Sequence, residues 1–418
     1  MQETDCRHPR QEPVMSSSRL TPDALLAELT GVDDLLIVQD LDGVCMDLVK
    51  DPLTRRIDAD YVHAVAALQG SFAVLTNGEH EGRRGVNRLV EKALGDRHNP
   101  GDEGLYLPGL AAGGVQCQTG AGDLSHPGVS EAEMGFLAGL PARMETELLR
   151  RLPAVLPSLS EQELQREAHA AVLDTQVSPT INLNGLFTYC DGDVDRQRRL
   201  QIMLQELMDA LMALAEASAL GESFFLHVAP NLGRDATGRE RLKPAEPGDV
   251  GSTDIQFMLR GAIKEAGLLV LINRHIAART GHAPLGDDFN VRTAPHDHAG
   301  LVALCEQTIP RDQMPVLVGV GDTVTSTACP EGTGWLRGGS DRGFLTLLQD
   351  LGALYAIPNR VVLVDSSGGE VDRPSLSDGR LDGISDADDP LRFDLLMPGG
   401  PKQYIQWFRQ LSDARQQR

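Results

Sequence analysis

Short apolar runs that end in small polar residues recur along the chain. Four of them are predicted to be strands, at residues 35–38, 71–75, 315–320 and 360–364. Each run is continuous rather than alternating, which is typical of a strand buried on both faces of a parallel sheet. Helical patterns lie between the runs. The pattern therefore predicts an open, Rossmann-like α/β sheet, whose ligands bind at the carboxyl ends of the strands.

The middle of the chain has a different pattern. It is mainly helical from about residue 128 to 218, and the clearest helix covers about 194–218, with leucines and methionines along one side. Residues 223–228 then resemble a strand. We therefore predict an α/β cap domain inserted into the sheet domain. The predicted division is a catalytic core at 19–127 and 250–418 and a cap at 128–249.

Charge and composition exclude several classes of function. The chain has 60 acidic and 38 basic residues, a net charge of −22. A surface this acidic repels nucleic acids and anionic membranes, so we expect neither as a partner. The six scattered cysteines form no CxxC pair, which argues against a disulfide framework or a zinc site. Residues 1–18 are polar, without a secretory signal, and are predicted to be a disordered tail of a cytoplasmic protein.

The sharpest chemical signal is the sequence Asp40-Leu41-Asp42-Gly43 after the first predicted strand. Carboxylates two positions apart leave an extended segment on the same side. Such a pair can divide the work of hydrolysis, because one carboxylate can attack phosphorus while the other protonates the leaving oxygen. Gly43 allows a turn without a side chain in the way. A simple turn at a strand end would look the same.

Three more polar residues follow the same logic. Thr76 and Asp322 each come directly after a predicted strand, and Lys264 precedes a predicted helix. A hydroxyl and a lysine can hold phosphate oxygens. Asp40 and Asp322 can bind Mg²⁺, which prefers one or two carboxylates, waters and a substrate phosphate. Taken singly, Thr76 is also compatible with a plain turn and Lys264 with a solvated helix surface.

The order of these residues resembles the four motifs of the haloacid dehalogenase-like phosphatases: DxDG, then Thr, a long insertion, then Lys and Gly-Asp. The place of the insertion resembles the cap of sucrose- and trehalose-phosphate phosphatases. Longer blocks resemble the cyanobacterial glucosylglycerol-phosphate phosphatase family. These blocks are VQDLDGVCM at 38–46, DPLTRRIDADY at 51–61, VLTNGEH at 74–80, EGLYLPGLAAGGVQ at 103–116, HVAPNLGRD at 227–235, FMLRGAIKEAG at 257–267 and GVGDTVTS at 319–326.

The resemblance implies a Mg²⁺-dependent phosphatase that hydrolyses glucosylglycerol 3-phosphate in the synthesis of a compatible solute. The protein partner that it suggests is the synthase that makes this substrate. It also implies residue roles. Asp40 would be the nucleophile and a metal ligand, and Asp42 the general acid and base, with its backbone carbonyl on the metal. Thr76 and Lys264 would hold the transferring phosphoryl group, and Asp322 would bind Mg²⁺.

One departure from the family pattern concerns the metal site. A second acid often follows the aspartate about one helical turn later, but residues 323–326 offer only hydroxyls and a valine. A glycine-rich stretch at 327–339, predicted to be a hairpin or loop, is followed by Asp341 at the start of a helical pattern. We therefore predict that Asp341 supplies the second acid. The alternative is that Ser340 and Asp341 only cap the helix.

The predicted substrate-binding residues lie in the segment after Thr76 and in the polar cluster after the strand of the cap. They are Asn77, Glu79, His80, His227, Asn231 and Arg234. For the cap cluster, a capped turn with a surface ion pair is the alternative.

Other functions fit the same residues. A trehalose- or sucrose-phosphate phosphatase would share every catalytic group. A phosphomutase would differ by shielding the phosphorylated aspartate from water. A noncatalytic regulator on this fold is the most distant alternative, because every predicted catalytic group is present.

Overall fold

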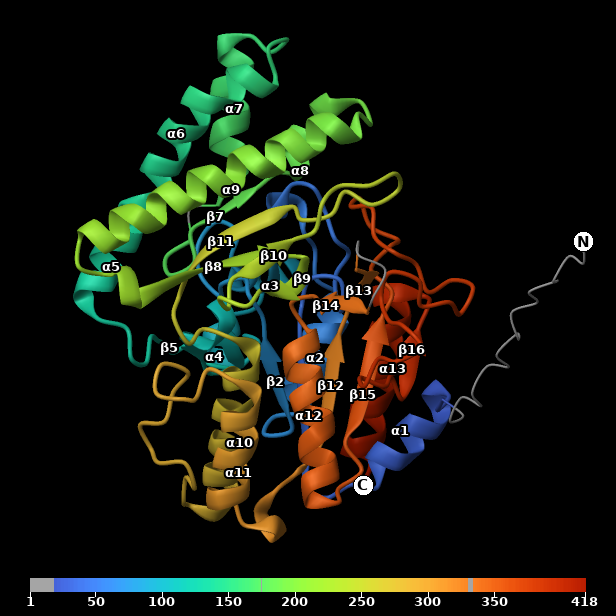
Figure 1. Cartoon of the computed structure of the whole chain (residues 1–418). Helices are drawn as coiled ribbons and strands as arrows, with labels where there is room; N and C mark the ends of the chain where they lie inside the picture. Colours follow the sequence, from blue (N-terminus) through green and yellow to red (C-terminus); the bar gives the residue numbers. More distant parts are fainter. Residues whose placement is uncertain (1–18, 174, 330–333) are drawn as a thin grey trace, which may run out of the picture.

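A computed structural model describes residues 19–173, 175–329 and 334–418. The predicted disordered tail, residues 1–18, lies outside the described residues, as do residues 330–333 of the predicted hairpin. The central feature is an eight-stranded sheet (Figure 1). In spatial order its strands are β16 (Leu395–Met397), β15 (Arg360–Val364), β12 (Val316–Gly321), β1 (Leu35–Gln39), β2 (Phe72–Leu75), β3 (Gly109–Ala111), β4 (Gln116–Gln118) and β5 (Leu124–Ser125).

The first six strands of this order run parallel, and β4 and β5 join antiparallel. The four strands predicted from apolar runs are β1, β2, β12 and β15, neighbours at the centre of the sheet. All five residues of β1 are buried. Leu35 and Ile37 join one hydrophobic cluster, while Leu36 and Val38 join the other, so the strand is covered on both faces.

Helices form a layer on each face of the large sheet (Figure 1). One layer contains α1 (Pro22–Thr30), α2 (Ala59–Ala67), α3 (Val86–Leu94) and α13 (Gly400–Gln416). The other contains α10 (Lys264–Thr280), α11 (His298–Thr308) and α12 (Arg342–Tyr355). The helices of both layers bury leucine, valine and aromatic side chains against the strands.

A second sheet of four antiparallel strands lies beyond the carboxyl ends of the large sheet (Figure 1). Its order is β6 (Val172–Leu173), β7 (Thr180–Asn182), β11 (Asp254–Leu259) and β8 (Phe224–Ala229). Its helices are α5 (Glu131–Ala138), α6 (Leu140–Val155), α7 (Glu161–Ala171), α8 (Asn184–Phe187) and α9 (Val194–Ala217). The predicted helix at 194–218 is α9, and most of its leucine and methionine side chains are buried.

The predicted fold class is therefore confirmed: a mostly parallel α/β sheet with an inserted α/β part. The predicted domain bounds stay a prediction, and the second sheet itself extends past residue 249, since β11 ends at Leu259.

Two hairpins connect the sheets. They are β9 (Asn231–Arg234) with β10 (Glu240–Leu242), and β13 (Thr325–Ala328) with β14 (Trp335–Gly338). The Thr325 hydroxyl donates to the Asn231 carbonyl at 2.6 Å, which ties one hairpin to the other.

The remaining helical turns are short. They are η1 (Pro52–Thr54), α4 (Pro100–Glu103), η2 (Ala112–Gly114), η3 (Thr188–Cys190), η4 (Gly221–Ser223) and η5 (Arg311–Gln313). The five described cysteines are free thiols. Among the helices of the described ranges, none has the length and apolar composition that crossing a membrane requires.

Candidate active site

Three of the predicted residues follow neighbouring parallel strands and meet at one edge of the large sheet. Asp40 follows β1, Thr76 follows β2 and Asp322 follows β12. The register of the sheet brings them to the same level, because Gln39 pairs with Val74 of β2 and with Val320 of β12. All three side chains are buried. The carboxyl ends of the central strands thus form the base of a polar site, as the open-sheet rule predicts.

Lys264 reaches this base from the first residue of α10. Its ammonium lies 2.5 Å from Oδ2 of Asp40 and 2.7 Å from Oδ1 of Asp341, and only 3% of the residue is exposed. Burial alone would lower the pKa of Lys264, but Asp341 and Asp40 raise it above its usual value. The lysine is therefore a fixed positive charge beside the candidate nucleophile rather than a solvated surface group.

Asp341 lies at the N-terminus of α12, but it does not cap this helix with its side chain. Its carboxylate turns toward the strand ends instead. Oδ2 accepts hydrogen bonds from the backbone N–H groups of Asp322 at 2.9 Å and Thr323 at 3.0 Å, while Oδ1 contacts Lys264. The β13–β14 hairpin returns the chain to the strand ends, so Asp341 lies beside Asp322 although 19 positions separate them.

Asp40, Asp322 and Asp341 form a cluster of acidic side chains that suits a cation. Within the described ranges, these are the three whose ligand oxygens all lie within 4.8 Å of one another. Both oxygens of Asp322 are buried without a hydrogen-bond partner among the described residues. A set of carboxylate oxygens suits a hard divalent cation such as Mg²⁺.

The pKa values of this cluster show how unfavourable the carboxylates are when no cation offsets their charge. Burial raises the pKa of Asp40 to about 7, although Lys264 lowers it. Burial and then repulsion by Asp341 and Asp40 raise the pKa of Asp322 well above its usual value. Gly43 leaves the space that the cluster needs, since it has a φ of +79° and a Cβ there would overlap the Asp322 carboxylate. A bound divalent cation would remove the repulsion.

Asp42 lies beside this cluster and has a partner that the sequence reasoning missed. Arg55 Nη1 lies 2.8 Å from Oδ2 and 3.1 Å from Oδ1 of Asp42. The guanidinium also donates to the backbone carbonyls of Pro52 and Arg84, so it is held from three sides. A fixed guanidinium orients the Asp42 carboxylate, and both side chains line the cavity that contains Asp40.

The cavity above these residues has a volume of about 180 Å³ and lies between the two sheets. Of the predicted substrate-binding residues, Asn77 and Glu79 line it. Asn77 also lines a second opening of about 380 Å³, on the Lys264 side, together with His227, Asn231 and Arg234. The predicted set is therefore divided between two openings next to the catalytic residues.

His80 is placed differently from the prediction. Its side chain is fully buried, it lines neither opening, and burial lowers its pKa to about 4. The reason is a tertiary contact, because the His80 backbone N–H donates to Gln116 of β4 at 2.6 Å and the chain turns into the core. The structure therefore places His80 at neither opening, and its predicted contact with the substrate finds no support in this geometry.

Similarity to known proteins identifies the family of this chain. Residues 34–412 match the model of a family described as glucosylglycerol-phosphate phosphatase. The chain belongs to this family. It is also 48% identical over 405 residues to a glucosylglycerol-phosphate phosphatase from Synechocystis sp., covering 94% of this chain and 96% of that protein. Both the predicted family and the prediction of a phosphatase are confirmed.

Solved structures show a more distant similarity. The C-terminal domain of trehalose-6-phosphate phosphatase from C. albicans is 11% identical, with a TM-score of 0.46, over 94% of this chain and 97% of that one. A trehalose-6-phosphate phosphatase related protein is 10% identical, with a TM-score of 0.40, over 91% and 97% of the two chains.

Several residues that line the site of this phosphatase were missed at the sequence level. Thr180 and Asn182 of β7 and Asp254 and Gln256 of β11 line the cavity with Asp40. Alternate residues of a strand share a face, so each pair lies on the side of the second sheet that faces the large sheet. The Asn182 amide donates to Asp254 at 2.8 Å. The signal was the alternation in TIN at 180–182 and DIQ at 254–256, which was too short to stand out.

Arg373 completes this polar lining from the loop after β15. Its guanidinium donates to the Gly251 carbonyl at 3.3 Å and lies 3.4 Å from the Thr253 hydroxyl. Burial lowers the pKa of Arg373, and aspartates around the site partly oppose this effect. A positive charge held beside a phosphate-binding site suits an anionic substrate.

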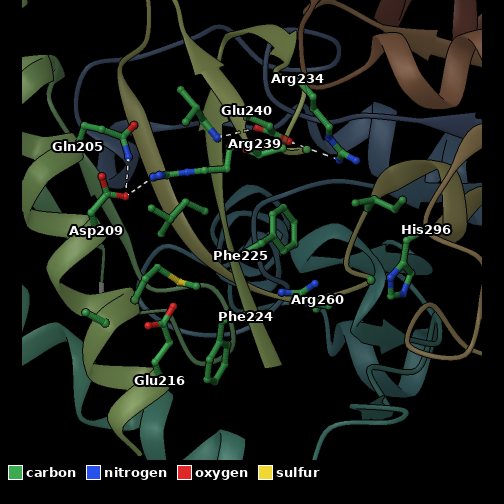
Figure 2. A pocket seen from close by; sticks show the side chains of 18 residues that line it. Gln205, Asp209, Glu216, Phe224, Phe225, Arg234, Arg239, Glu240, Arg260 and His296 are labelled. Carbon is green, nitrogen blue, oxygen red and sulfur yellow. Dashed lines mark hydrogen bonds and ion pairs between the residues drawn. The ribbon is translucent and has the colours of Figure 1, made fainter. Parts of the chain in front are cut away.

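The phosphatase also has a larger cavity away from these residues. Figure 2 shows it between α9, β8, β10 and the segment of Arg260. Its volume is about 540 Å³. Arg239 pairs there with Asp209, and Arg234 lies 3.6 Å from Glu240. None of the predicted catalytic residues lines this cavity. The cavity of about 180 Å³ is the candidate active site, because Asp40, Asp42, Thr76 and Asp322 line it.

Proposed function

We propose that this chain hydrolyses glucosylglycerol 3-phosphate to glucosylglycerol and inorganic phosphate, the step that releases a compatible solute. Membership of the glucosylglycerol-phosphate phosphatase family carries this proposal. The arrangement of Asp40, Lys264 and Asp341 supports it, since a carboxylate beside a fixed lysine suits attack on a phosphate ester. The test is phosphate release by the purified chain, with Mg²⁺, from glucosylglycerol 3-phosphate. Absence of release from this compound, with release from another sugar phosphate, would refute the substrate.

The proposed reaction has two steps. In the first, a carboxylate oxygen of Asp40 forms a bond to phosphorus, the bond from phosphorus to the ester oxygen breaks, and Asp42 gives that oxygen a proton. In the second, Asp42 takes a proton from water, the water oxygen attacks phosphorus, and the bond to Asp40 breaks. Together the two steps return the protein to its starting state after one cycle.

Other residues of the chain hold the groups in place. Lys264 and Thr76 would bind the phosphoryl oxygens, and Arg55 holds the Asp42 carboxylate. Asp40 and Asp322, with Asp341 beside them, would hold Mg²⁺, and the backbone carbonyl of Asp42 is a further proposed ligand. When bound, the cation supplies positive charge that neutralises the phosphoryl group. The polar face of β7 and β11 would bind the glycoside hydroxyls.

Asp341→Asn is expected to raise the Mg²⁺ concentration for half-maximal activity by about 10-fold, the low end of effects measured for residues that support metal ligands. The amide would present its NH₂ group to Lys264 or to the N–H groups of Asp322 and Thr323, and either arrangement loses a contact. Titration of activity with Mg²⁺ measures the change. Asp389→Asn is the matched control, because Asp389 is also buried near α12 but pairs with Arg342. An unchanged Mg²⁺ requirement and turnover in Asp341→Asn would contradict the role.

Asp42→Asn is expected to reduce turnover less than Asp40→Asn does. General acid–base catalysis by one group typically contributes roughly 10²–10⁴-fold, whereas the bond to phosphorus depends on Asp40 entirely. The loss in Asp42→Asn should shrink with an aryl phosphate, whose leaving oxygen departs without a proton. Steady-state turnover with both substrates measures this. An equal loss on both substrates would argue against Asp42 as the acid.

A further inference from the structure

The loop that carries Thr76 also touches the second sheet at two points. Asn77 Nδ2 lies 2.8 Å from Nε2 of His227, on β8. Glu79 contacts residues 176–178, in the connection between β6 and β7. The order of the second sheet is β6-β7-β11-β8, so the two contacts lie near its opposite edges. One short loop of the large sheet thus holds both sides of the sheet above it.

The Glu79 contact is the stronger of the two. Oε2 accepts from the backbone N–H of Gln176 at 2.8 Å, and Oε1 accepts from the N–H groups of Val177 at 2.8 Å and Ser178 at 2.9 Å. The Ser178 hydroxyl donates to Oε1 as well, at 2.9 Å. Successive N–H groups of this kind form a nest that binds an anion. Only 3% of Glu79 is exposed, so the contact is shielded from water.

This geometry argues against the predicted role of Glu79 as a direct ligand of the sugar. An ionised carboxylate has about four lone-pair positions for hydrogen bonds, and four donors already contact Glu79. Three of them contact Oε1 and one contacts Oε2, so only Oε2 has an acceptor position left for a sugar hydroxyl. The contacts therefore favour a role of Glu79 through the second sheet, and its direct binding of the substrate stays a prediction.

The His227 contact continues away from the site. His227 Nδ1 lies 2.9 Å from Glu240, whose carboxylate also accepts from the backbone N–H of Val228 at 2.9 Å. Glu240 forms part of the wall of the cavity in Figure 2. Because Glu240 holds His227 by one ring nitrogen, the other is fixed toward Asn77. The edge strand β8 is thereby attached to the loop through a chain of polar groups with the buried His227 at its centre.

The loop that makes these contacts is itself held by backbone hydrogen bonds. The Gly78 carbonyl accepts from Ala112 at 2.7 Å, and the Thr76 carbonyl accepts from Gly113 at 3.1 Å. The walls of the candidate active site come from both sheets, with Asp40 and Thr76 below and Asn182 and Gln256 above. The spacing between the reacting phosphoryl group and the glycoside therefore depends on how the second sheet is held.

We propose that Glu79 and Asn77 are positioning residues that hold the second sheet at a fixed place above Asp40, so that the glycoside contacts of β7 and β11 align the phosphate for attack. This inference rests on the proposed function. Misplacement by about 1 Å of groups remote from the reacting atoms can lower a rate by about 10²-fold. Glu79 and Asn77 would thus matter for a substrate with a glycoside and much less for a small phosphate ester.

The test compares Glu79→Gln with the parent on two substrates, glucosylglycerol 3-phosphate and p-nitrophenyl phosphate. The amide keeps one acceptor oxygen but turns an NH₂ group toward backbone donors. We expect kcat/KM for the glycoside to fall about 10- to 100-fold, mostly through kcat because alignment is lost, and far less for the aryl ester. Glu81→Gln is the matched control, because Glu81 is an exposed neighbour in the same segment. Equal losses on both substrates, or no loss on either, would overturn the proposal.

A second variant tests the same contact from the other sheet. Ser178→Ala removes one donor to Glu79 and leaves the core unchanged. In a double-mutant cycle, the free-energy losses in kcat/KM for the glycoside that Glu79→Gln and Ser178→Ala cause should be non-additive. Hydrogen exchange should also accelerate at residues 176–178 in Glu79→Gln, since those amides lose their acceptor. Additive losses together with unchanged exchange would contradict the proposal.

The proposed function fails in a different way. If the parent hydrolyses the aryl ester but not glucosylglycerol 3-phosphate, the substrate is wrong. The same variants are then measured with the sugar phosphate that the parent hydrolyses best. The loss in kcat/KM for that substrate, relative to the loss for the aryl ester, then tests the positioning role of Glu79.

Discussion

Asp40→Asn is expected to fold and to lose at least about 10³-fold in turnover, on the scale seen when a catalytic nucleophile is removed. An amide oxygen does not form the acyl phosphate that the proposed first step requires. Asn keeps the shape of the side chain, although its NH₂ group must face either Lys264 or the Leu41 N–H, so one contact is lost while Lys264 keeps Asp341. Phosphate release from glucosylglycerol 3-phosphate measures the loss, with mass spectrometry to exclude deamidation back to Asp. Near-parental turnover in a sample free of Asp would contradict the mechanism.

Thermal unfolding shows whether Asp40→Asn still folds. The expected direction of the change in melting temperature follows from the pKa of Asp40. Burial raises the pKa of Asp40 from 3.8 to about 7. An acid whose pKa is raised in the folded state favours folding below its unfolded pKa and loses that contribution as the pH rises through the folded value. Above pH 7 and without a divalent cation, the neutral amide in Asp40→Asn should therefore leave the melting temperature unchanged or higher. A large drop in the melting temperature would mean that the lost turnover results from unfolding.

Glucosylglycerol 3-phosphate is expected to exceed trehalose 6-phosphate and sucrose phosphate in kcat/KM by at least about 100-fold. The cavity between the sheets is about 180 Å³, below the roughly 300–1,000 Å³ of pockets that hold drug-sized ligands. Glycerol takes less room than a second sugar ring. The lining is polar, and Oε1 of Gln256 has no partner among the described residues. A site that hydrogen-bonds one polyol rejects analogues that leave such groups unpaired.

Initial rates on a panel of the three phosphates, at equal Mg²⁺, measure this preference. p-Nitrophenyl phosphate serves as the reference for the chemistry without a glycoside. Equal or higher kcat/KM for trehalose 6-phosphate would overturn the substrate, while the phosphatase chemistry would remain.

The centre of the fold and of the site was predictable because both depend on short local patterns. A continuous apolar run followed by a polar residue identifies a buried parallel strand and its carboxyl end at once. Asp40, Thr76 and Asp322 are placed by this rule alone. Asp341 required a further step, the inference that a glycine-rich hairpin returns the chain to the metal site, and the structure places its carboxylate beside Asp322.

The upper half of the site was harder to predict for physical reasons. β7 has only three residues, so its alternation of polar and apolar positions is too short to recognise. Arg373 comes from a loop without any periodic pattern. Glu79 and His80 follow Thr76 closely, but their directions depend on partners far along the chain, residues 176–178 and Gln116. Adjacency in sequence suggested a sugar contact for both residues, but the tertiary contacts bury His80 and engage the Glu79 carboxylate with the second sheet.

Trapping the phosphorylated protein tests the central claim most directly. The chain is mixed with glucosylglycerol 3-phosphate that carries a radiolabelled phosphoryl group and is quenched in acid within the first turnover. Asp42→Asn is measured in parallel with labelled p-nitrophenyl phosphate, whose leaving oxygen needs no proton from Asp42, because slower attack by water should then increase the trapped fraction. The account predicts label on the peptide that contains Asp40 and none on the same peptide of Asp40→Asn. Phosphate release without labelled protein, or label on a different peptide, would contradict it.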